Sequence, residues 1–538
     1  MKLTAILAQK DKLLFRIEGA YDGALIRVRE LSAALGGHRL LKSEYAHKAD
    51  TGLYTIPRFD GCRDRLISRF EVDGAPGVCY VTDFVDSRDD SEYPTSPSIM
   101  AFGAHTKDEK AFRTSQGGVG FCISAMMASS PDVCPVIEHV YNGKTYYFRQ
   151  DAVEAYDAGM LNGYNKGFRM TCAIINSDFG YGYTGDEEMM KVLRHPHQDR
   201  SFKDAYMCAF NLVTEDGLDA YAACIDFIGQ RYTRPDRKYG LAVGMILSNE
   251  VTSQYYWANA GEMTCHDFMR EYTTVMRVTW QIMSQYYKEF RVYVSMDHFW
   301  TGSFNPSQPL RFYSGRNTIE EINGFAKREG DFNWNVVEHP YPENLAYPDF
   351  WNDRSADFNY DTARITFKNI EMLPAYLQQE HLLYKGKPRR IVLNEQGFNS
   401  RGDELQAYSE EQAAAAYVLA YMKIRKQPTI DYFTVHAYVD NPYEFGLNLG
   451  VYRFDPDSPD KTGEKKPIYY AICDMDTEKE PERIERARNF IGAPLFDYLL
   501  DPPIRYAGRD RSKDGLSKEG AGGPVKKKEQ KEEKKEEA

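Results

Sequence analysis

The chain has 538 residues, of which 42% are apolar and 27% charged, and its formal net charge is −12. This composition is typical of a globular protein with a large core and excludes wholesale disorder. Because no run of about 18 uncharged apolar residues occurs, we expect no membrane-spanning helix. The chain is acidic and has no basic stripe outside its C-terminal tail, so we expect no nucleic-acid partner.

The cysteines and the N-terminus carry little further signal. The nine cysteines are odd in number and form no Cys-x-x-Cys pair, so the sequence predicts neither a zinc site nor a disulfide framework. The first apolar segment is interrupted at residues 9–12, before it reaches the roughly 7–15 residues of a signal peptide. We therefore expect a first strand there and a cytoplasmic protein, unless a leader was removed.

The 39 tyrosines and 29 phenylalanines fit either an aromatic core or a sugar site lined with rings.

The pattern of apolar and polar residues divides the chain into three regions. Residues 1–110 hold short β-like runs separated by turn residues, which predict an accessory β region. In residues 111–500, short apolar runs alternate with longer helical segments, as in parallel strands joined by crossover helices. Residues 501–538 form a C-terminal segment that ends in a Gly-, Lys- and Glu-rich tail, and this tail is too polar to fold alone.

The alternating region predicts a (β/α)8 TIM barrel. An eighth strand is expected within residues 115–145, in addition to seven apolar runs at residues 168–176, 205–212, 241–249, 291–296, 334–337, 390–394 and 432–435. Helices are predicted over residues 216–231, 264–285 and 409–426, the last with a capping box that begins at Ser409. A doubly wound sheet is the alternative, although no Gly-rich loop follows the first strand.

Polar residues directly follow two of the predicted strands. Asn249-Glu250 closes one apolar run and Asn394-Glu395 closes another. In a TIM barrel the C-terminal ends of the strands form the active site, and a carboxylate there is costly without a partner or a role. Two such glutamates are what a retaining glycosidase requires, one as acid/base and one as nucleophile, about 5–5.5 Å apart. The alternative is a pair of salt-bridged or helix-capping glutamates.

Other predicted strand ends supply amide, imidazole and aromatic groups. Such groups hydrogen-bond sugar hydroxyls and stack on sugar rings. The candidate substrate-binding residues are Asn176, Asn211, Asn249, Asp297, His298, Trp300, His339, Tyr341, His436 and Tyr438. Several histidines could instead hold a metal, but they lie on different strands without the close spacing of a zinc motif, so no metal is predicted.

These motifs together resemble a known group of enzymes. Ser248-Asn249-Glu250, His339-Pro340-Tyr341 and Asn394-Glu395-Gln396-Gly397 resemble the clan-A retaining glycoside hydrolases. More closely, the chain is similar to an uncharacterised bacterial glycosidase-like family, catalogued as a domain of unknown function and distantly similar to family thirty-nine glycoside hydrolases. The matching stretches are residues 56–61, 248–251, 257–261, 297–300, 339–342, 350–353 and 393–400.

The resemblance implies roles for individual residues. Glu250 would be the acid/base and Glu395 the nucleophile, while Asn249 would contact the substrate 2-hydroxyl. Tyr341 would orient the nucleophile, and the sugar site would be lined by His298, His339, Trp300, His436 and Asn211. The resemblance also implies a carbohydrate substrate and no cofactor. The sequence departs from the family at residues 111–145, where the first barrel strand is not evident.

The predicted activity is hydrolysis of O-glycosidic bonds in an oligo- or polysaccharide by double displacement. One alternative is a catalytically inactive carbohydrate-binding barrel, which a wide carboxyl separation or a salt bridge to either glutamate would favour. The other is a metal-assisted hydrolase that uses the histidines.

Overall fold

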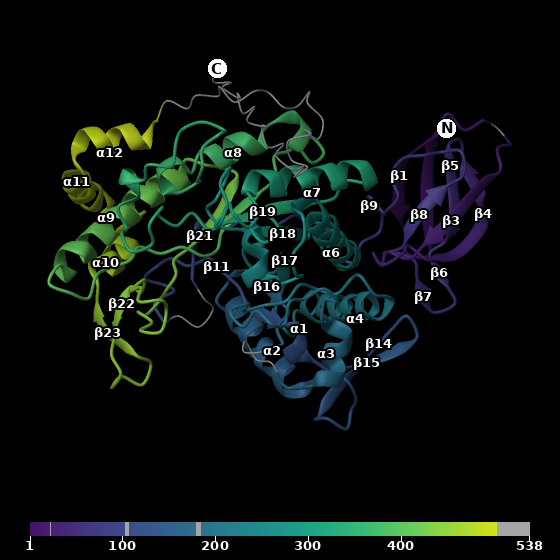
Figure 1. Cartoon of the computed structure of the whole chain (residues 1–538), viewed down its shortest axis with the longest axis horizontal. Coiled ribbons are helices and arrows are strands. Elements are labelled where there is room, and N and C mark those ends of the chain that lie inside the picture. The colour runs from purple at the N-terminus through teal and green to yellow at the C-terminus, as the bar shows by residue number, and fades with distance from the viewer. Residues whose placement is uncertain (22, 103–106, 179–183, 503–538) are drawn as a thin grey trace, which may run out of the picture.

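The computed structural model describes residues 1–502 except 22, 103–106 and 179–183 (Figure 1). The predicted polar tail lies outside the described residues. An N-terminal β region stands at one end of the molecule, beside a larger barrel surrounded by helices (Figure 1). In the part of the chain that the structure describes, no helix combines the length and apolar character needed to cross a membrane.

The N-terminal β region is a seven-stranded sheet with the strand order β8-β3-β4-β5-β2-β1-β9. Along β2 and β3 buried and exposed side chains alternate, which is the pattern of a sheet with one solvated face. The expected accessory region and its first strand are therefore confirmed. The strands are β1 (Lys2–Ala8), β2 (Lys12–Glu18), β3 (Ile26–Leu31), β4 (Leu40–Asp50), β5 (Leu53–Pro57), β8 (Arg69–Val72) and β9 (Asp83–Phe84), with a small hairpin of β6 (Phe59–Asp60) and β7 (Arg63–Asp64).

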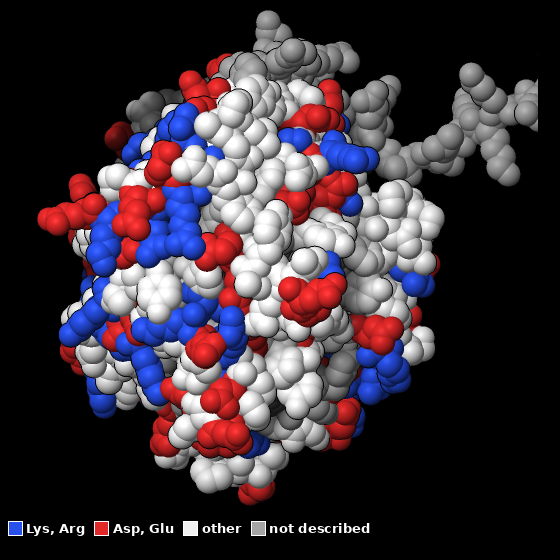
Figure 2. Space-filling model, turned by 90° about the vertical axis from the view of Figure 1, so that its left-hand side faces the viewer, with Lys and Arg blue, Asp and Glu red and all other residues white. Residues whose placement is uncertain are grey.

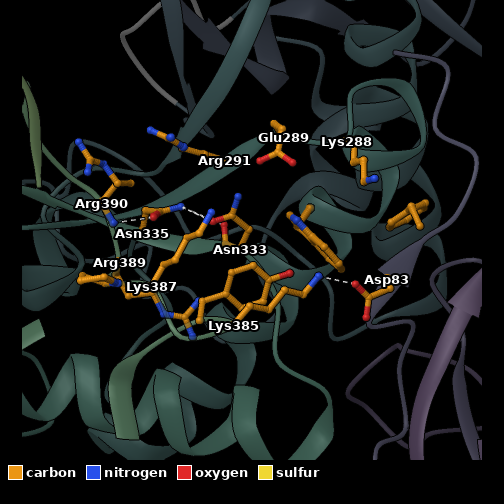
Figure 3. Close-up of a pocket in the computed structure, with 14 residues that line it drawn as sticks. Asp83, Lys288, Glu289, Arg291, Asn333, Asn335, Lys385, Lys387, Arg389 and Arg390 are labelled. Carbon is orange, nitrogen blue, oxygen red and sulfur yellow. Dashed lines mark hydrogen bonds and ion pairs between the residues drawn. The ribbon is translucent and has the colours of Figure 1, made fainter. Parts of the chain in front are cut away.

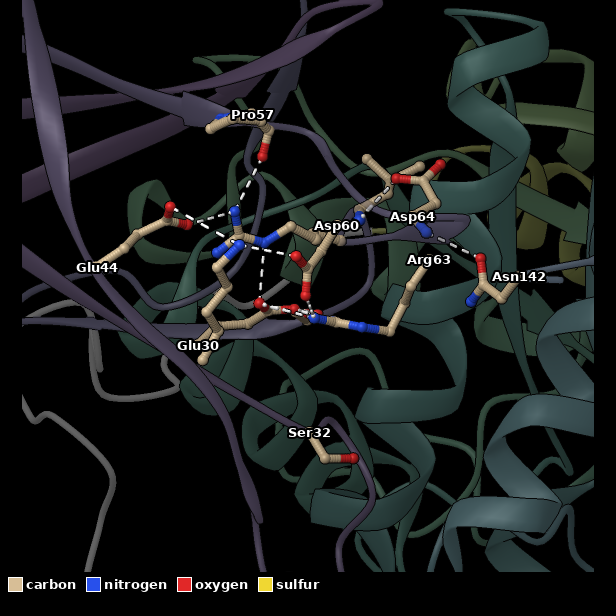
Figure 4. Close-up of polar contacts among 12 residues, drawn as sticks. Glu30, Ser32, Glu44, Pro57, Asp60, Arg63, Asp64 and Asn142 are labelled. Carbon is tan, nitrogen blue, oxygen red and sulfur yellow. Dashed lines mark hydrogen bonds and ion pairs between the residues drawn. The ribbon is translucent and has the colours of Figure 1, made fainter.

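A buried ionic network ties this hairpin to the sheet (Figure 4). The carboxylate of Glu30 is fully buried and accepts hydrogen bonds from Arg63, from Arg65 Nε at 2.8 Å and from Ser68 Oγ at 2.7 Å. Arg65 also pairs with Glu44 at 2.6 Å. A buried carboxylate is tolerated only when it is paired and hydrogen-bonded in this way, so the network specifies one arrangement of β3 and the hairpin.

The N-terminal β region is docked on the outer helices of the barrel. The Asp64 amide donates to Asn142 Oδ1 at 2.9 Å, in the turn between β14 (Val136–Tyr141) and β15 (Lys144–Arg149) (Figure 4). Arg58 donates to both Asp64 and Gln285, and Ser32 donates to Glu215 at 2.9 Å. These contacts join the β region to the side of the barrel.

The barrel sheet has the order β11-β10-β21-β20-β19-β18-β17-β16-β12, is parallel throughout, and closes where β11 pairs with β16. Because β11 and β12 both pair with β16, they occupy one position, and the eight positions confirm the predicted (β/α)8 barrel. The strands are β10 (Met100–Ala101), β11 (Gln116–Gly117), β12 (Gly120–Cys122), β16 (Arg169–Ile175), β17 (Ala242–Leu247), β18 (Arg291–Met296), β19 (Trp334–Glu338), β20 (Ile391–Leu393) and β21 (Ile430–Thr434).

Helices surround this barrel. The predicted helices at residues 216–231 and 264–285 are confirmed, and threonine hydroxyls at Thr214 and Thr264 cap them by accepting backbone hydrogen bonds. The longer helices are α2 (Gln150–Asn165), α4 (Glu215–Tyr232), α6 (Cys265–Tyr286), α7 (Gly315–Glu329) and α9 (Gln406–Arg425). The shorter ones are α1 (Ile123–Met126), α3 (Glu187–Leu193), α5 (Gln254–Trp257), α8 (Met372–Leu377), α10 (Pro467–Asp474), α11 (Glu480–Ile491) and α12 (Ala493–Leu500).

The C-terminal helices α10, α11 and α12 all contact α9, beside the hairpin of β22 (Tyr452–Phe454) and β23 (Thr462–Lys465). Lys, Arg, Asp and Glu side chains are interleaved over much of this side of the molecule (Figure 2). Arg425, for example, pairs with Asp476 and Glu480. This mosaic of ion pairs keeps the surface polar without a strong field of one sign.

One strand prediction is wrong. Residues 205–212 form only isolated bridges, Arg194 with Phe210 and Cys208 with Asn259, because this apolar run is buried in the connection after β16. The missing strand position is filled by β10, which lies before residue 111, where we expected the barrel to begin. A buried loop and a buried strand have the same apolar signature, so periodicity cannot separate them. The strand expected within residues 115–145 is present as β11 and β12.

The prediction of a capping box at Ser409 is also wrong. Helix α9 begins at Gln406, so Ser409 lies inside the first turn. Its hydroxyl donates to the Gln406 carbonyl and accepts from the Arg401 amide. Serine near a helix start has several backbone partners within reach, and here it selects one outside the capping geometry.

Candidate active site

A cleft of about 1230 Å³ opens at the C-terminal ends of the barrel strands. Apolar side chains from six strands fill the barrel interior: Ala101, Ile246, Tyr293, Val337, Val392 and Tyr432. Among the predicted site residues, the structure brings to this cleft Asn249, Glu250, Asp297, His298, His339, Tyr341, Glu395 and His436.

The backbone after β17 is unusual. Ser248 and Glu250 have positive φ angles of 58° and 34°, a region that non-glycine residues rarely adopt. Each such residue costs about 1–3 kcal/mol, and strain of this kind concentrates at functional sites. The Glu250 amide donates to Ser295 Oγ at 3.2 Å, which links this turn to the neighbouring strand β18. Glu250 and the intervening Asn249 both line the cleft.

The end of β20 requires a glycine. A Cβ atom on Gly397 would lie 2.1 Å from the His436 carbonyl oxygen, so only glycine allows these two chain segments to approach. The His436 amide donates to the Gln396 carbonyl at 2.8 Å. The segment that carries Glu395 is thereby held against the end of β21.

The two glutamates meet across one buried histidine. Side-chain atoms of Glu250, His339 and Glu395 lie within 4.8 Å of one another. His339 Nδ1 is 2.9 Å from Glu250 Oε1 and 4.0 Å from Glu395 Oε2. The Tyr341 hydroxyl donates to Glu395 Oε1 at 3.3 Å. The glutamate side chains are 18% and 35% exposed, so a ligand in the cleft can reach both.

His339 compensates the negative charge of this pair. Burial lowers its pKa, but the carboxylates of Glu395 and Glu250 act in the opposite direction and raise the pKa to about 9. Its Nε2 donates to Asn394 Oδ1 at 2.8 Å, and its Nδ1–H is shared with Glu250. Both ring nitrogens are engaged in these contacts, so the histidine and the two glutamates form a charge-paired group in this structure; the same three side chains have the ligand types and spacing that could hold a metal ion.

Two more buried acids lie beside this group. Burial and the negative charge of Glu250 raise the pKa of Asp297 to about 7, against the hydrogen bond that Asp297 accepts from Ser253. Burial raises the pKa of Glu338 well above its ordinary value, and the charge of Asp297 adds to this. Glu338 is the last residue of β19 and was not among the predicted site residues, although it directly follows a predicted buried strand.

The pKa values of the other two cleft histidines shift in opposite directions. Burial lowers the pKa of His298 to about 4, so this ring is neutral and its Nδ1–H donates to the Tyr341 carbonyl at 3.0 Å. Burial also lowers the pKa of His436, but its contact with Glu444 outweighs burial and the pKa is raised. The cleft thus holds neutral and charged imidazoles side by side.

Two predicted asparagines do not line the cleft. Asn176 is buried and donates to the Leu193 carbonyl at 2.9 Å. Asn211 donates to the Val192 carbonyl at 2.8 Å and to Thr214 Oγ1 at 2.9 Å. Both side chains satisfy backbone groups in the connections around α3 and α4. The structure therefore places both side chains outside the cleft, in contacts that satisfy buried polar groups.

Two predicted aromatic residues also lie elsewhere. Trp300 is 2% exposed, donates to the Tyr360 carbonyl at 2.9 Å and packs edge-on against Tyr376. The Tyr438 hydroxyl donates to Asp108 at 2.6 Å. Neither ring lines the cleft, because Trp300 is buried among loop residues and the Tyr438 hydroxyl is hydrogen-bonded to Asp108. A position two residues after a strand end does not determine which way a loop side chain turns.

The cleft contains aromatic residues that strand-end reasoning missed. Tyr206 and Trp257 are stacked, with ring centroids 4.7 Å apart and an interplanar angle of 18°. Further rings at its margin belong to Tyr256, Phe304, Tyr443 and Phe445. All belong to long connections or short loop helices, where no periodic pattern marks them. The high aromatic content of the chain was a signal for all of them, and Trp257 also begins one of the stretches, residues 257–261, that resemble the glycosidase-like family.

Residues 99–498 match the model of one family, which is described as a family of unknown function (DUF5722). The chain belongs to this family. The match begins just before β10 and ends within α12, so the unit shared by DUF5722 members is the barrel with its C-terminal helices. The N-terminal β region of this DUF5722 chain lies outside the match. Among curated proteins, none matches the chain.

Several solved structures have similar folds. A family 39 glycoside hydrolase from Bacteroides cellulosilyticus WH2 is 14% identical, covers 88% of this chain and 80% of its own, and has a TM-score of 0.40. A β-glucosidase from Pyrococcus furiosus is 12% identical, with 72% and 84% covered and a TM-score of 0.43. A β-glycosidase from Thermosphaera aggregans is 10% identical, with 74% and 99% covered and a TM-score of 0.42. With TM-scores below 0.5, these likenesses do not bear on the function of the DUF5722 chain.

Proposed function

We propose that this protein is a retaining glycoside hydrolase in which Glu250 is the acid/base and Glu395 the nucleophile. One observation carries the proposal: the two carboxylates face one cleft with oxygen atoms no more than 4.8 Å apart. Carboxyl groups of retaining glycosidases stand about 5–5.5 Å apart, whereas inverting enzymes need about 6.5–9.5 Å to admit a water. The observed spacing supports direct attack by one carboxylate on the sugar.

The first step is attack by Glu395 on the anomeric carbon. The Tyr341 hydroxyl holds Glu395 Oε1, which leaves Oε2 for the new C–O bond. As the glycosidic bond breaks, its oxygen takes a proton from Glu250 and the aglycone departs. Asn249, which precedes Glu250 and lines the cleft, is the candidate contact to the 2-hydroxyl, and such a contact strengthens in the transition state.

The second step returns both residues to their starting state. Glu250, now a carboxylate, removes a proton from water, and the hydroxide attacks the anomeric carbon and releases Glu395. The proton that Glu250 gives to the leaving group is the one it shares with His339 Nδ1, and the proton taken from water restores it. The Nδ1–Oε1 hydrogen bond holds one proton that either Glu250 or His339 can own, so His339 is a positioning residue for the acid proton.

Substitution of the two glutamates tests the proposal. With aryl glycosides as substrates, Glu250→Ala and Glu395→Ala should each lower kcat by about 100- to 10,000-fold, and azide should rescue Glu395→Ala by forming a glycosyl azide. Glu482→Ala, an exposed residue of α11, is the matched control and should leave turnover unchanged. NMR of the first-formed sugar should detect the anomeric configuration of the substrate. Full activity of both variants would overturn the proposal.

A carbohydrate-binding barrel without catalysis is the second candidate. It is favoured by the ion pair between His339 and Glu250, which engages one oxygen of the proposed acid. In that case the wild-type protein would bind oligosaccharides without cleaving them, and Glu250→Ala would weaken binding rather than turnover. The same two variants therefore distinguish the candidates.

A further inference from the structure

The charge of the cleft is one-sided. Five carboxylates line it: Glu250, Asp297, Glu343, Glu395 and Glu444. Among the described residues that line it, no lysine and no arginine occurs. Arg364 lies 3.9 Å from Glu343 but does not line the cleft, so a ligand meets carboxylates with no Lys or Arg among the described lining residues.

The imidazoles compensate part of this negative charge, but they are engaged by the glutamates and leave no free cation for a ligand among the described lining residues. His339 is paired with Glu250, His436 with Glu444, and His298 is neutral at ordinary pH. In a partly buried site the Coulomb repulsion between like charges is several times stronger than in water. A carboxylate or sulfate group on a sugar would enter such a field without a cation to receive it. Arginine and lysine are the side chains that supply such binding.

The mouth of the cleft is aromatic. Tyr443, Phe445 and Phe304 are 90%, 76% and 56% exposed, far more than the two glutamates. Phe304 follows β18, whereas Tyr443 and Phe445 follow β21, so the rings come from separate connections that both border the cleft. Large apolar rings are costly to leave in water unless they serve a contact. Rings in these positions can stack on the apolar faces of sugar units outside the cleavage site.

We infer, on the basis of the proposed function, that the substrate is an oligo- or polysaccharide without carboxylate or sulfate groups, whose units beyond the cleaved bond stack on Phe304, Tyr443 and Phe445. The carboxylates exclude anionic glycans, and the aromatic mouth binds the uncharged sugar chain. Specificity in this cleft therefore arises from repulsion as well as from attraction.

The charge preference is tested with matched polysaccharides. Pairs that share backbone and linkage and differ only at C6, such as β-1,4-glucan and β-1,4-glucuronan or β-1,4-mannan and β-1,4-mannuronan, are offered to the full-length protein. Release of reducing ends should be at least about tenfold faster for the neutral member of any pair that is cleaved. Equal or faster cleavage of the carboxylated member would overturn the inference.

Binding separates this inference from the proposed function. The Glu395→Gln variant keeps the shape of the cleft, and calorimetry should detect binding of the neutral oligosaccharide and none of its carboxylated counterpart. If Glu250→Ala and Glu395→Ala retain full turnover of a neutral glycan, the catalytic assignment is wrong and the charge preference still holds. If carboxylated glycans are cleaved as well as neutral ones and Glu395→Ala abolishes both, only the charge inference is wrong.

The aromatic part is tested by truncation. Tyr443→Ala and Phe445→Ala should each raise KM for a hexasaccharide about tenfold, because loss of a stacking contact costs about one decade in affinity. The kcat for an aryl monoglycoside, which does not reach the mouth, is measured beside it as the second value. Tyr21→Ala, at an exposed tyrosine of the N-terminal β region, is the control and should change neither value. An unchanged KM for the hexasaccharide in both cleft variants would contradict the proposed stacking.

Discussion

The two ends of the barrel carry opposite charge. At the N-terminal ends of β18, β19 and β20 lies a pocket of about 490 Å³, next to β9 of the N-terminal β region (Figure 3). It is lined by the cations of Lys288, Arg291, Lys385, Lys387, Arg389 and Arg390 and by the acids Asp83 and Glu289. The cleft at the other end contains carboxylates without Lys or Arg among its described lining residues. The protein does place lysine and arginine around a barrel pocket, but at the opposite end. The lack of Lys and Arg among the described lining residues of the cleft is therefore specific to the cleft and does not follow from the overall composition.

The two ends also differ in how charges are neutralised. Arg389 is buried and pairs with Asp331 at 2.7 Å, and Arg291 and Arg390 both pair with Asp431. These pairs join the starts of the strands, so they contribute to stability. In the cleft, the buried acids instead have raised pKa values because their negative charge is only partly compensated. Perturbed acids at the C-terminal end of a barrel are typical of a reactive site.

The largest expected effect is on the chemistry of the cleft. Glu395→Gln should lower kcat by at least about 1000-fold, while the free energy of unfolding changes by less than about 1 kcal/mol. Removal of one of two neighbouring carboxylates relieves repulsion, which offsets the lost contact with Tyr341. Enzyme assays and urea unfolding measure the two quantities. A large loss of stability in this variant would contradict the distinction between a catalytic end and a stabilising end of the barrel.

A substitution in the pocket at the N-terminal ends of the strands should lower stability and leave the chemistry unchanged. Arg389→Met should lower the free energy of unfolding by about 3–5 kcal/mol, because Asp331 and the carbonyls of Phe332 and Leu382 lose their buried donor. The kcat of the folded fraction should stay unchanged. Urea unfolding and activity at low temperature check both. A variant as stable as the wild type would show that these ion pairs are not structural.

The stability of the protein should also depend on Asp297. Its folded pKa of about 7 lies above the usual value of 3.8, so the folded state binds this proton more tightly. The stability that this group confers is therefore present below about pH 4 and is lost as the pH rises through 7. Asp297→Asn cannot lose a proton, so relative to the wild type it should gain at most about 4 kcal/mol between pH 4 and pH 8. Urea midpoints at both pH values measure this gain.

A matched control makes this result specific. Asp457→Asn changes an exposed aspartate of the β22–β23 turn and should shift the midpoints equally at both pH values. If Asp297→Asn behaves in the same way, Asp297 is ionised without penalty. The acids of the cleft would then be less strained than their burial implies.

The smallest effect is expected at an unpaired cation. Lys288 lines the pocket, is exposed, and has no ion-pair partner among the described residues. Lys288→Ala should change the free energy of unfolding by no more than about 0.5 kcal/mol and leave kcat unaltered. A loss comparable to that of Arg389→Met would mean that the pocket is stabilised by its total charge rather than by specific pairs.

Much of the fold was predictable from local patterns. Six of the seven predicted apolar runs are barrel strands, and Thr214 and Thr264 begin the two helices predicted nearest to them. The run at residues 205–212 was wrongly predicted as a strand, because a buried connection is as apolar as a strand. β10 escaped notice because it is only two residues long and pairs through its neighbours. Short strands owe their existence to the sheet they complete.

The candidate site was predictable only in part. A carboxylate that ends a buried strand must face the mouth of a barrel, so Asn249, Glu250 and Glu395 could be named in advance. Trp300 and Tyr438 could not be excluded, because loop side chains turn toward partners that are remote in sequence. The rings of Tyr443 and Phe445 were missed for the same reason.

Strand periodicity and the polar residues that end each strand are local properties, and they were sufficient for the barrel and for the two glutamates. The distance between those glutamates, the protonated histidine between them and the one-sided charge of the cleft depend on which strands become neighbours. Electrostatic effects act through space and vary with burial, so these properties exist only once the chain is folded.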